Sequence, residues 1–410
     1  MNKKVSLWVL ICAVLFSAAV ASLVTVSVQK DEARTRIVEI VSTEAQSRED
    51  DPISSKLKEI EATVKNGFLF EVDAEKAADE VASAYMYSLD DRYAAYFTKE
   101  EYDQITDSNR GNQQGIGVSV MSFDEEKALE IVNVTPGSPA EKAGLEIGDL
   151  IVKAGDEDVA DLGFEGTVLK LRGESGTAAR FTVSRKVDGV EKLIEFEIVR
   201  EAFDAQTVLF EGLGNGIGYI RVTEFNGKTP EQFSSALESL VSDGCGKFVF
   251  DLRNNPGGML SSITKILDKL LPEGPIIRMT DKDGNEETVD SDAEELDYPF
   301  AVIVNGDTAS AAELFTSAMR DYSKAKIFGT TTYGKGSVQI TVTLSDGSAV
   351  KYTHQLYSPP FSDNYDGKGI VPDVEVELPE ELANQNLFRL RHEDDTQLKA
   401  AVDYLEQTSK

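Results

Sequence analysis

The sequence predicts a layered α/β core that carries an inserted β-rich domain and follows a helical module. From residue 216 onward, strands alternate with helices, which is the pattern of an α/β core. Residues 113–200 instead combine frequent glycines with short strands, as in a compact β-rich domain. Residues 53–112 place apolar side chains at helical spacing. With 410 residues the chain is long enough for two or three such domains.

The N-terminal segment is apolar. Lys3 and Lys4 precede residues 5–28, a run longer than the ~20 residues that a helix needs to span a bilayer. Positive charge in front of the run predicts that the N-terminus stays in the cytoplasm and the rest lies outside. The alternative is a cleaved signal peptide, because Ala19-Val20-Ala21 fits an A-x-A cleavage site. Under either interpretation the remaining chain is exported, and it begins with a polar stalk at residues 29–52.

The helical module, residues 53–112, is expected to contain three helices. One runs from Pro52 to about Asn66, a second from Ala74 to Leu89, and a short third follows a turn at residues 90–98. We expect this module to support a homodimer. In the β-rich domain the predicted strands are Gly117–Val120, Leu129–Val134, Leu150–Val152, Ala179–Val183 and Leu193–Val199.

The α/β core is assigned to residues 201–380 and is followed by a C-terminal helical segment, residues 381–410. An acidic, turn-rich insertion is expected at residues 273–299. The predicted strands are Ile217–Val222, Phe248–Leu252, Ala301–Val304, Lys326–Gly329 and Val338–Leu344. The predicted helices are Thr229–Ser242, Gly258–Leu271, Ser310–Tyr322 and Asp394–Glu406.

Composition excludes several classes of function. The net charge of −31 argues against binding to nucleic acid or to anionic lipid, and the simplest role of the acidic surface is solubility. The two cysteines, Cys12 and Cys245, cannot form a disulfide within the exported chain, and Cys245 fits a small buried residue. Two histidines, His354 and His392, argue against a His/Cys zinc site, and no G-x-S-x-G motif accompanies them.

Two polar clusters each follow a predicted buried strand. The first, Asp251–Gly258, ends in Pro-Gly-Gly, whose main chain a ligand can approach closely. The alternative is a plain strand-to-helix turn. In the second, Asn305–Glu313, Ser310 stands between two alanines at the start of a helix, where N–H groups suit a developing oxyanion. The alternative is an ordinary N-cap serine, with Thr308 sharing that role.

The third cluster, Gly329–Gln339, matches a phosphate loop up to its last position. There Gly336 replaces the hydroxyl residue that would hold magnesium, and a strand rather than a helix follows, so a nucleotide site is disfavoured. Lys335, between two glycines, suggests another use. Burial lowers the pKa of an amine, and a neutral lysine can take a proton from a serine. Gln339 shares a strand face with Lys335 if the strand begins that early, and could orient it.

These clusters, in this order, resemble those of the carboxyl-terminal processing (tail-specific) proteases. The resemblance covers about Asp90 to Val376; the matching stretches are Asp251–Gly258, Thr308–Glu313, Gly334–Gln339 and Gly369–Val374. It implies a ClpP/crotonase-like layered core with Ser310 as nucleophile, Lys335 as general base and Gln339 as its orienting residue. It also implies an oxyanion hole formed by Ala311 with Gly257 or Gly258, and no metal, nucleotide or other cofactor.

Residues 113–200 then resemble the PDZ domain of that family. Gly115-Ile116-Gly117-Val118 is similar to its carboxylate-binding loop, where a peptide adds as an extra strand and N–H groups hold its C-terminus. The alternative is a β domain that only packs on the core. Arg172, after the predicted helix, is our candidate for coupling PDZ occupancy to the active site. Residues 354–361 depart from the family's usual Tyr-Tyr-Thr-Pro-Ser-Gly run, which affects the expected substrate groove.

Three functions compete on these grounds. The first is an exported serine endopeptidase that recognises protein C-termini through its PDZ domain. The second is a non-catalytic PDZ scaffold on an inactive core, which would lose Ser310 or Lys335, although both are present. The third is a signalling protease that cuts a single partner with the same chemistry as the first.

Overall fold

The computed structural model describes residues 51–123, 128–187, 189–382, 387 and 390–408. The predicted anchor or signal peptide and nearly all of the stalk lie outside these residues. Across the described part of the chain, no helix has both the length and the apolar character needed to cross a membrane. The chain divides into two compact units, residues 1–78 and 79–410, which are described separately below.

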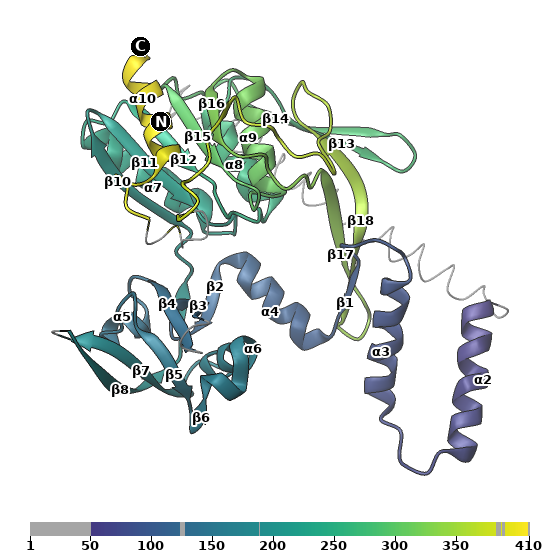
Figure 1. Ribbon diagram of the computed structural model, residues 1–410. Helices are drawn as coiled ribbons and strands as arrows, with labels where there is room; N and C mark the ends of the chain where they lie inside the picture. Colours follow the sequence, from purple (N-terminus) through teal and green to yellow (C-terminus); the bar gives the residue numbers. More distant parts are fainter. Residues whose placement is uncertain (1–50, 124–127, 188, 383–386, 388–389, 409–410) are drawn as a thin grey trace, which may run out of the picture. The chain divides into compact units, whose positions relative to one another are not determined.

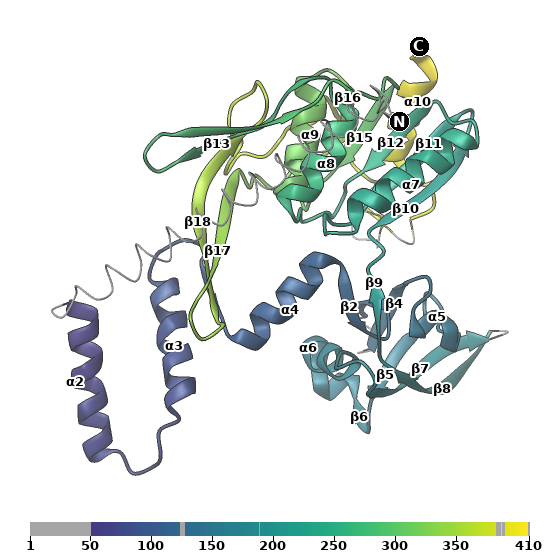
Figure 2. The ribbon, with the colours of Figure 1, turned by 180° about the vertical axis from the view of Figure 1, so that it is seen from behind.

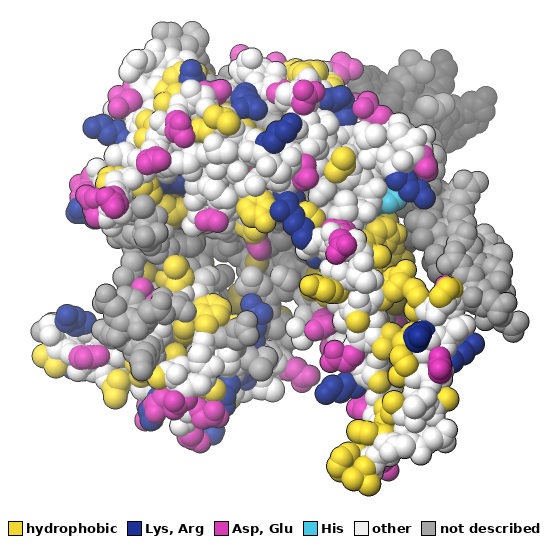
Figure 3. Space-filling view, turned by 45° about the vertical axis from the view of Figure 1, so that its right-hand side comes forward, with side chains coloured by type: hydrophobic (Ala, Val, Ile, Leu, Met, Phe, Trp, Pro, Cys, Tyr) yellow, Lys and Arg dark blue, Asp and Glu magenta, His cyan; other side chains and the backbone are white. Residues whose placement is uncertain are grey.

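The described part of the first unit is helical, as predicted. Helix α2 (Pro52–Gly67) begins with Pro52 in its first turn, and the Asp51 carboxylate accepts a hydrogen bond from Ser54 N at 3.1 Å. Helix α3 (Ala74–Tyr87) begins in this unit and ends two residues before the predicted Leu89. Hydrophobic side chains lie on the surface of the N-terminal helices (Figure 3). On α2 the exposed apolar residues are Ile53, Leu57, Ile60 and Val64.

The central sheet of the second unit has six strands in the order β10-β11-β12-β15-β16-β19. Strand β10 is antiparallel to β11, and the other neighbours are parallel. This confirms the predicted α/β core. The strands are β10 (Val208–Gly214), β11 (Ile217–Val222), β12 (Lys247–Asp251), β15 (Phe300–Val304), β16 (Ala325–Gly329) and β19 (Val374–Glu375).

Helices cover both faces of this sheet (Figure 1). Phe250 and Val302 pack with three helices on one face, whereas Val249 and Ala301 pack with the C-terminal helix on the other. This alternation follows from the two-residue period of a strand, and burial on both faces explains the continuous apolar runs. The helices are α7 (Thr229–Ser242), α8 (Leu260–Leu270) and α9 (Ala311–Asp321) on the first face and α10 (Thr396–Gln407) on the second.

Residues 273–299, where a turn-rich insertion is expected, instead form a hairpin of a second, antiparallel sheet (Figure 2). That expectation was wrong because the acidic side chains of this segment lie on exposed positions of a hairpin whose other face is buried at Ile277 and Met279. The Asp281 carboxylate fixes the turn by accepting from Asp283 N and Asn285 N. The strands are β1 (Ala95–Phe97), β13 (Gly274–Asp281), β14 (Glu286–Ser291), β17 (Ser337–Thr343) and β18 (Ala349–Ser358).

The β-rich domain has its own core and sheet, with strand order β3-β4-β5-β7-β8 and β6 paired to β5. The chain enters from α4 (Lys99–Arg110) through β2 (Asn112–Gly115) and leaves through β9 (Glu201–Asp204), which pairs with β2. The remaining elements are β3 (Val118–Phe123), β4 (Ala128–Val134), α5 (Pro139–Ala143), β5 (Leu150–Ala154), β6 (Glu157–Asp158), α6 (Val159–Leu171), β7 (Ala178–Val187) and β8 (Val190–Val199).

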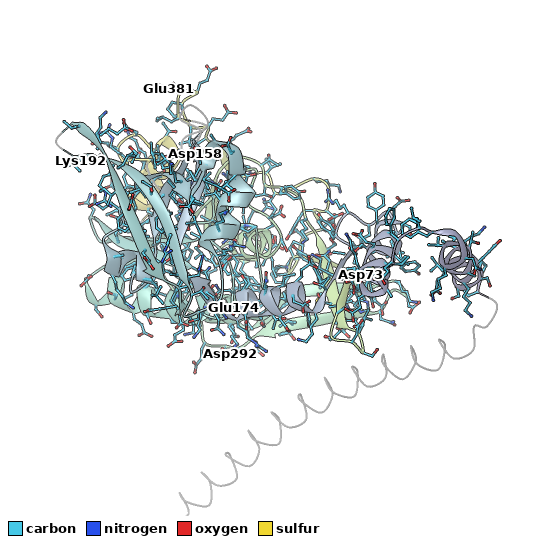
Figure 4. The ribbon with its side chains drawn as sticks, turned by 90° about the horizontal axis from the view of Figure 1, so that it is seen from below. Asp73, Asp158, Glu174, Lys192, Asp292 and Glu381 are labelled. Atoms are coloured by element: carbon cyan, nitrogen blue, oxygen red, sulfur yellow. The ribbon has the colours of Figure 1, made fainter. Side chains whose placement is uncertain are left out.

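Acidic side chains contribute to the exposed surface of the second unit. Asp158, Asp292 and Glu381 are exposed, and their side chains project from the ribbon (Figure 4). This placement accords with an acidic surface whose role is solubility.

Candidate active site

The three polar clusters predicted from the sequence meet at one edge of the central sheet. They follow β12, β15 and β16, and because these strands are parallel neighbours their carboxyl ends lie together. Hydrogen bonds join the clusters directly. Thr308 Oγ1 donates to Leu252 O at 2.9 Å, Ala309 N to Asn255 O at 2.9 Å, and Tyr333 N to Thr308 O at 3.0 Å.

Ser310 has a strained backbone. Its φ of 55° and ψ of −119° lie outside the regions that non-glycine residues usually occupy. An ordinary N-cap residue has extended dihedrals, so the simple capping role does not explain this conformation. Strain of this kind is typical of a nucleophile held on a sharp turn between a strand and a helix. Here the turn connects β15 to α9.

The Pro-Gly-Gly turn lies against Ser310. A Cβ on Gly257, where φ is 100°, would come within 2.8 Å of Ser310 Cβ and of Ala311 N, so only glycine fits. Gly257 N donates to Asn255 Oδ1 at 2.8 Å. A Cβ on Gly258 would collide with the main chain of Phe225. Of the hydrogen bonds among described residues, none uses the N–H of Ala311 or Gly258, and both remain available to a ligand.

Glu313 connects the serine and lysine loops. Its carboxylate is fully buried and accepts four hydrogen bonds, from Ser310 N (2.8 Å), Thr332 Oγ1 (2.6 Å), Gly334 N (2.7 Å) and Lys335 N (2.8 Å). One carboxylate therefore fixes the main chain of Ser310 relative to that of Lys335. The two predicted residues lie in loops that share this buried anchor.

Lys335 is half-buried, and its pKa is lowered from its ordinary value. Burial is the largest cause, and the positive charges of Lys351 and Arg92 act in the same direction, against the carboxylates of Glu313 and Asp366. The Lys335 carbonyl accepts a hydrogen bond from Tyr357 Oη at 2.6 Å. This environment favours the neutral amine.

Gln339 is held on strand β17. Because β17 begins at Ser337, Lys335 precedes the strand rather than sharing a face of it. Gln339 Nε2 donates to Ser337 Oγ at 3.1 Å and to Thr353 Oγ1 at 3.3 Å. The role of Gln339 in orienting Lys335 stays a prediction.

The glycine-rich loop of the β-rich domain joins β2 to β3. Gly115, Ile116 and Gly117 are buried, and Val118 opens β3, an edge strand whose partner among the described strands is β4. Ala140 N donates to Ile116 O, and Thr135 N donates to Gly117 O, which fixes the loop. Arg172 directly follows α6 and is exposed.

Sequence reasoning missed three residues of this site: Glu313, Tyr357 and Tyr93. Burial raises the pKa of Tyr357, which stays a neutral donor to Lys335 O. Tyr93 lies in the segment before β1, and its ring centroid is 4.4 Å from Lys335 Nζ. The spacing of Ser310 and Glu313 was a usable signal, because an acid three residues after a serine marks a helix start.

The chain is similar to known proteases over most of its length. The model of peptidase family S41 matches residues 216–376, and a PDZ domain model matches residues 130–185. The carboxy-terminal processing protease CtpA of Bacillus subtilis is 33% identical over 329 residues, which are 79% of this chain and 69% of that protein. A CtpA-like serine protease of Staphylococcus saprophyticus is 30% identical over 328 residues, 79% of this chain and 65% of the relative.

A solved structure from Bacteroides fragilis, assigned to the S41 proteases, covers 80% of this chain and 90% of its own, with a TM-score of 0.56 and 18% identity. This likeness supports the fold alone. The layered α/β core, the PDZ domain and these matches define a serine-type peptidase. The chain belongs to peptidase family S41, and its relatives include carboxy-terminal processing proteases.

Proposed function

We propose that the protein is an exported serine endopeptidase that selects substrates by their C-termini and cleaves them through an acyl-enzyme. The observation that carries the proposal is the carboxylate of Glu313, which holds the main chain of Ser310 and of Lys335 at the same time. Beside it, the unused N–H groups of Ala311 and Gly258 offer donors for an oxyanion.

In the proposed reaction, neutral Lys335 takes the proton of Ser310 as Oγ attacks the carbonyl carbon of the scissile bond. Negative charge develops on the carbonyl oxygen, which the N–H of Ala311 and one glycine N–H stabilise. Gly258 is the better candidate than Gly257, whose N–H already donates to Asn255. The Lys335 ammonium then protonates the leaving amine, the C–N bond breaks, and Lys335 activates a water that hydrolyses the ester. Gln339 orients Lys335, and no cofactor takes part.

The test is cleavage of a labelled protein substrate by purified enzyme. Ser310→Ala and Lys335→Ala are expected to abolish cleavage, while chelators leave the wild-type rate unchanged. Exposed Lys192→Ala is the matched control for the lysine variant and is expected to cleave at the wild-type rate. A Ser310→Ala protein that still cleaves at the wild-type rate would refute the serine mechanism.

The PDZ domain is proposed to supply substrate selection. In this proposal, N–H groups of the loop from Gly115 to Val118 hold a terminal carboxylate, and a peptide adds to the edge of β3, whose partner among the described strands is β4. Substrate with an amidated C-terminus is therefore expected to be cut more slowly than the same substrate with a free carboxylate. Equal rates would contradict recognition through the C-terminus.

We further propose that residues 1–28 tether the enzyme to the cell membrane with its catalytic domain outside, or export it as a cleaved signal peptide. The two lysines before the apolar run support this orientation. The exposed apolar residues of α2 support a homodimer, because an apolar helix face that is exposed among the described residues is stabilised by self-association. Cell fractionation tests the first proposal, and sedimentation equilibrium tests the second.

A further inference from the structure

A short segment before β1, Asp91-Arg92-Tyr93, contacts the site although the whole PDZ domain separates it from Lys335 in the sequence. Strand β1 pairs with β18, from Ala95 opposite Lys351 to Phe97 opposite Ala349. This pairing brings the segment to the second sheet, next to β17 and its Gln339. Nothing in the serine–lysine reaction described above assigns it a role.

Tyr93 presents its ring to Lys335. The ammonium nitrogen lies 4.4 Å from the ring centroid, and the guanidinium of Arg92 lies 4.7 Å from the same centroid. These distances are those of cation–π contacts. The Tyr93 hydroxyl is buried and, among the described residues, makes no hydrogen bond of good geometry, although the Arg92 guanidinium lies close enough to act on its pKa. The ring rather than the hydroxyl is therefore what Tyr93 offers to Lys335.

Asp91 reaches Gln339 through Thr353. The Asp91 carboxylate accepts from Tyr93 N at 2.9 Å, from Thr353 N at 2.8 Å and from Thr353 Oγ1 at 3.1 Å. Burial acts to raise the pKa of Asp91, but these hydrogen bonds outweigh it and the pKa is lowered, so Asp91 is ionised and only accepts. The hydroxyl of Thr353 has one hydrogen to donate, and it donates that hydrogen bond to Asp91.

The direction of the next hydrogen bond follows. Because the Thr353 hydroxyl already donates its hydrogen bond to Asp91, Thr353 Oγ1 can act only as an acceptor toward other groups. It accepts a hydrogen bond from Gln339 Nε2 at 3.3 Å. Ser337 accepts from the same amide nitrogen through Oγ at 3.1 Å and through its carbonyl oxygen at 3.4 Å. The Gln339 carbonyl oxygen is then left as the acceptor for an ammonium.

We propose that Asp91 and Tyr93 are positioning residues of the active site, with Tyr93 holding the Lys335 amine against its ring and Asp91 orienting the Gln339 amide through Thr353. This inference rests on the proposed serine–lysine mechanism. It links the reaction centre to the segment that connects α3 to α4.

Tyr93 is one of several neighbours that affect the pKa of Lys335. Lys351 on β18 and Arg92 disfavour the ammonium, whereas Glu313 on α9 and Asp366 favour it. An aromatic face also favours the ammonium. Since Lys335 must be neutral to act as a base, the acidic limb of kcat/KM against pH follows its pKa. Loss of the ring moves this limb to lower pH, and loss of Lys351 moves it to higher pH.

The decisive comparison is Tyr93→Leu against Tyr93→Phe. Tyr93→Leu is expected to shift the apparent pKa of the acidic limb of kcat/KM downward by about 0.4–1.5 pH units, as estimated from the usual strength of a cation–π contact. Tyr93→Phe keeps the face and is expected to keep the limb at its wild-type position, and Lys351→Gln is expected to shift it the opposite way. An unshifted limb in Tyr93→Leu, or the same shift in both Tyr93 variants, would overturn the role of the ring.

Thr353 tests the second half of the inference. Thr353→Val removes the hydroxyl between Asp91 and Gln339 and is expected to lower kcat roughly tenfold with little change in KM, from the loss of one hydrogen bond. Thr353→Ser is expected to restore kcat. If Ser310→Ala and Lys335→Ala are inactive while Thr353→Val keeps the wild-type kcat, the orienting role fails and the mechanism stands. If the two active-site variants still cleave, the proposed function itself fails.

Discussion

Glu313 is the residue on which the geometry of the site depends most. It is fully buried and accepts four hydrogen bonds, three of them from the main chain. A carboxylate suits four converging donors because it has two oxygens and no proton to donate. A glutamine has one acceptor oxygen and an NH₂ group that would face a donor. The charge and the shape of the carboxylate are both required.

Glu313→Gln is therefore expected to lower kcat by at least tenfold and to destabilise the fold by about 1–3 kcal/mol for each donor left unpaired. The measurements are the cleavage rate and urea unfolding. Glu286→Gln, at an exposed position with an ion-pair distance of 3.9 Å to Arg278, is the matched control and should change neither quantity. Wild-type kinetics in Glu313→Gln would show that the loops do not need this anchor.

The sequence singled out Ser310, Lys335 and the Pro-Gly-Gly turn as candidates, because each lies in the loop that follows a predicted strand. The spacing of Ser310 and Glu313 indicates a helix start, but it does not predict that Glu313 also binds the loop of Lys335. Its donors at Gly334 and Lys335 come from a loop about twenty residues later, and main-chain N–H groups leave no mark in a sequence. Tyr93 was hidden for the same reason, since its contact with Lys335 spans the PDZ domain.

Among the elements, helix α10 is fastened to the sheet by a buried ion pair. Arg253, at the end of β12, binds Asp251 through Nη2 at 2.6 Å and Asp395 through Nη2 at 2.7 Å, and all three side chains are buried. Asp395 is also the N-cap of α10 and accepts from Gln397 N and Leu398 N. A single carboxylate thus starts the helix and attaches it to the strand that leads to Gly257.

Asp395→Asn keeps the cap and removes the charge, because asparagine caps helices as well as aspartate does. It is expected to destabilise the protein by about 1.5–3 kcal/mol, the usual contribution of a hydrogen bond to a charged group. Urea unfolding measures the change. Asp394→Asn removes an exposed ion pair with Arg391 and is expected to alter stability by less than about 0.5 kcal/mol. Equal effects of the two variants would contradict the fastening role.

The same cluster predicts a loss of stability in acid. Burial acts to raise the pKa of Asp251, but the charges and hydrogen bonds of Arg253 outweigh it and hold the pKa at about 2, below the ordinary 3.8. Because the pKa of Asp251 is lower in the folded state than in the unfolded state, its ionised carboxylate stabilises the fold fully above pH 3.8. This stabilisation is lost as the pH falls toward 2. Thermal unfolding between pH 5 and pH 2 should show this decline. A melting temperature independent of pH over that range would contradict it.

The predicted elements differ in how well the sequence defined them. Strand β11 and helix α7 have the predicted bounds, because β11 is apolar except for Arg221 and α7 begins with a proline in its first turn. Helix α8 begins two residues later than expected, since Gly257 and Gly258 have positive φ. Strands β14 and β18 were not predicted, because both carry mostly polar or half-exposed side chains and depend on their sheet partners.

For the whole molecule, the entry and exit of the PDZ domain are the informative feature. The chain arrives on β2 and leaves on β9, and these strands pair from Asn112 opposite Asp204 to Gly115 opposite Glu201. A further hydrogen bond joins the chain after β9 to the chain before β2, because Ala205 N donates to Gly111 O at 2.9 Å. The loop that is proposed to bind a carboxylate begins at Gly115, directly at the end of this ladder. The insertion was visible in the sequence as a change of composition, but the pairing of its two ends was not.

Arg172 is proposed to transmit PDZ occupancy to the catalytic centre. It is exposed after α6, free to meet a partner that arrives with the substrate. Arg172→Ala is expected to slow cleavage of a protein with a free C-terminus. Arg180→Ala, in an exposed ion pair of the same domain with Glu197, is the control and is expected to leave the rate unchanged. An unchanged rate in Arg172→Ala would reject the coupling.

The hydrogen bonds by which Glu313 holds the loops of Ser310 and Lys335 have a practical consequence. Three of its four hydrogen bonds come from peptide N–H groups, so they do not depend on the side chains to which the proposed reaction assigns the chemistry. A Ser310→Ala enzyme should keep the loops of residues 310 and 335 in their arrangement and retain bound polypeptides without cleaving them. Such a protein would serve as a trap, capturing natural targets from exported proteins for direct identification.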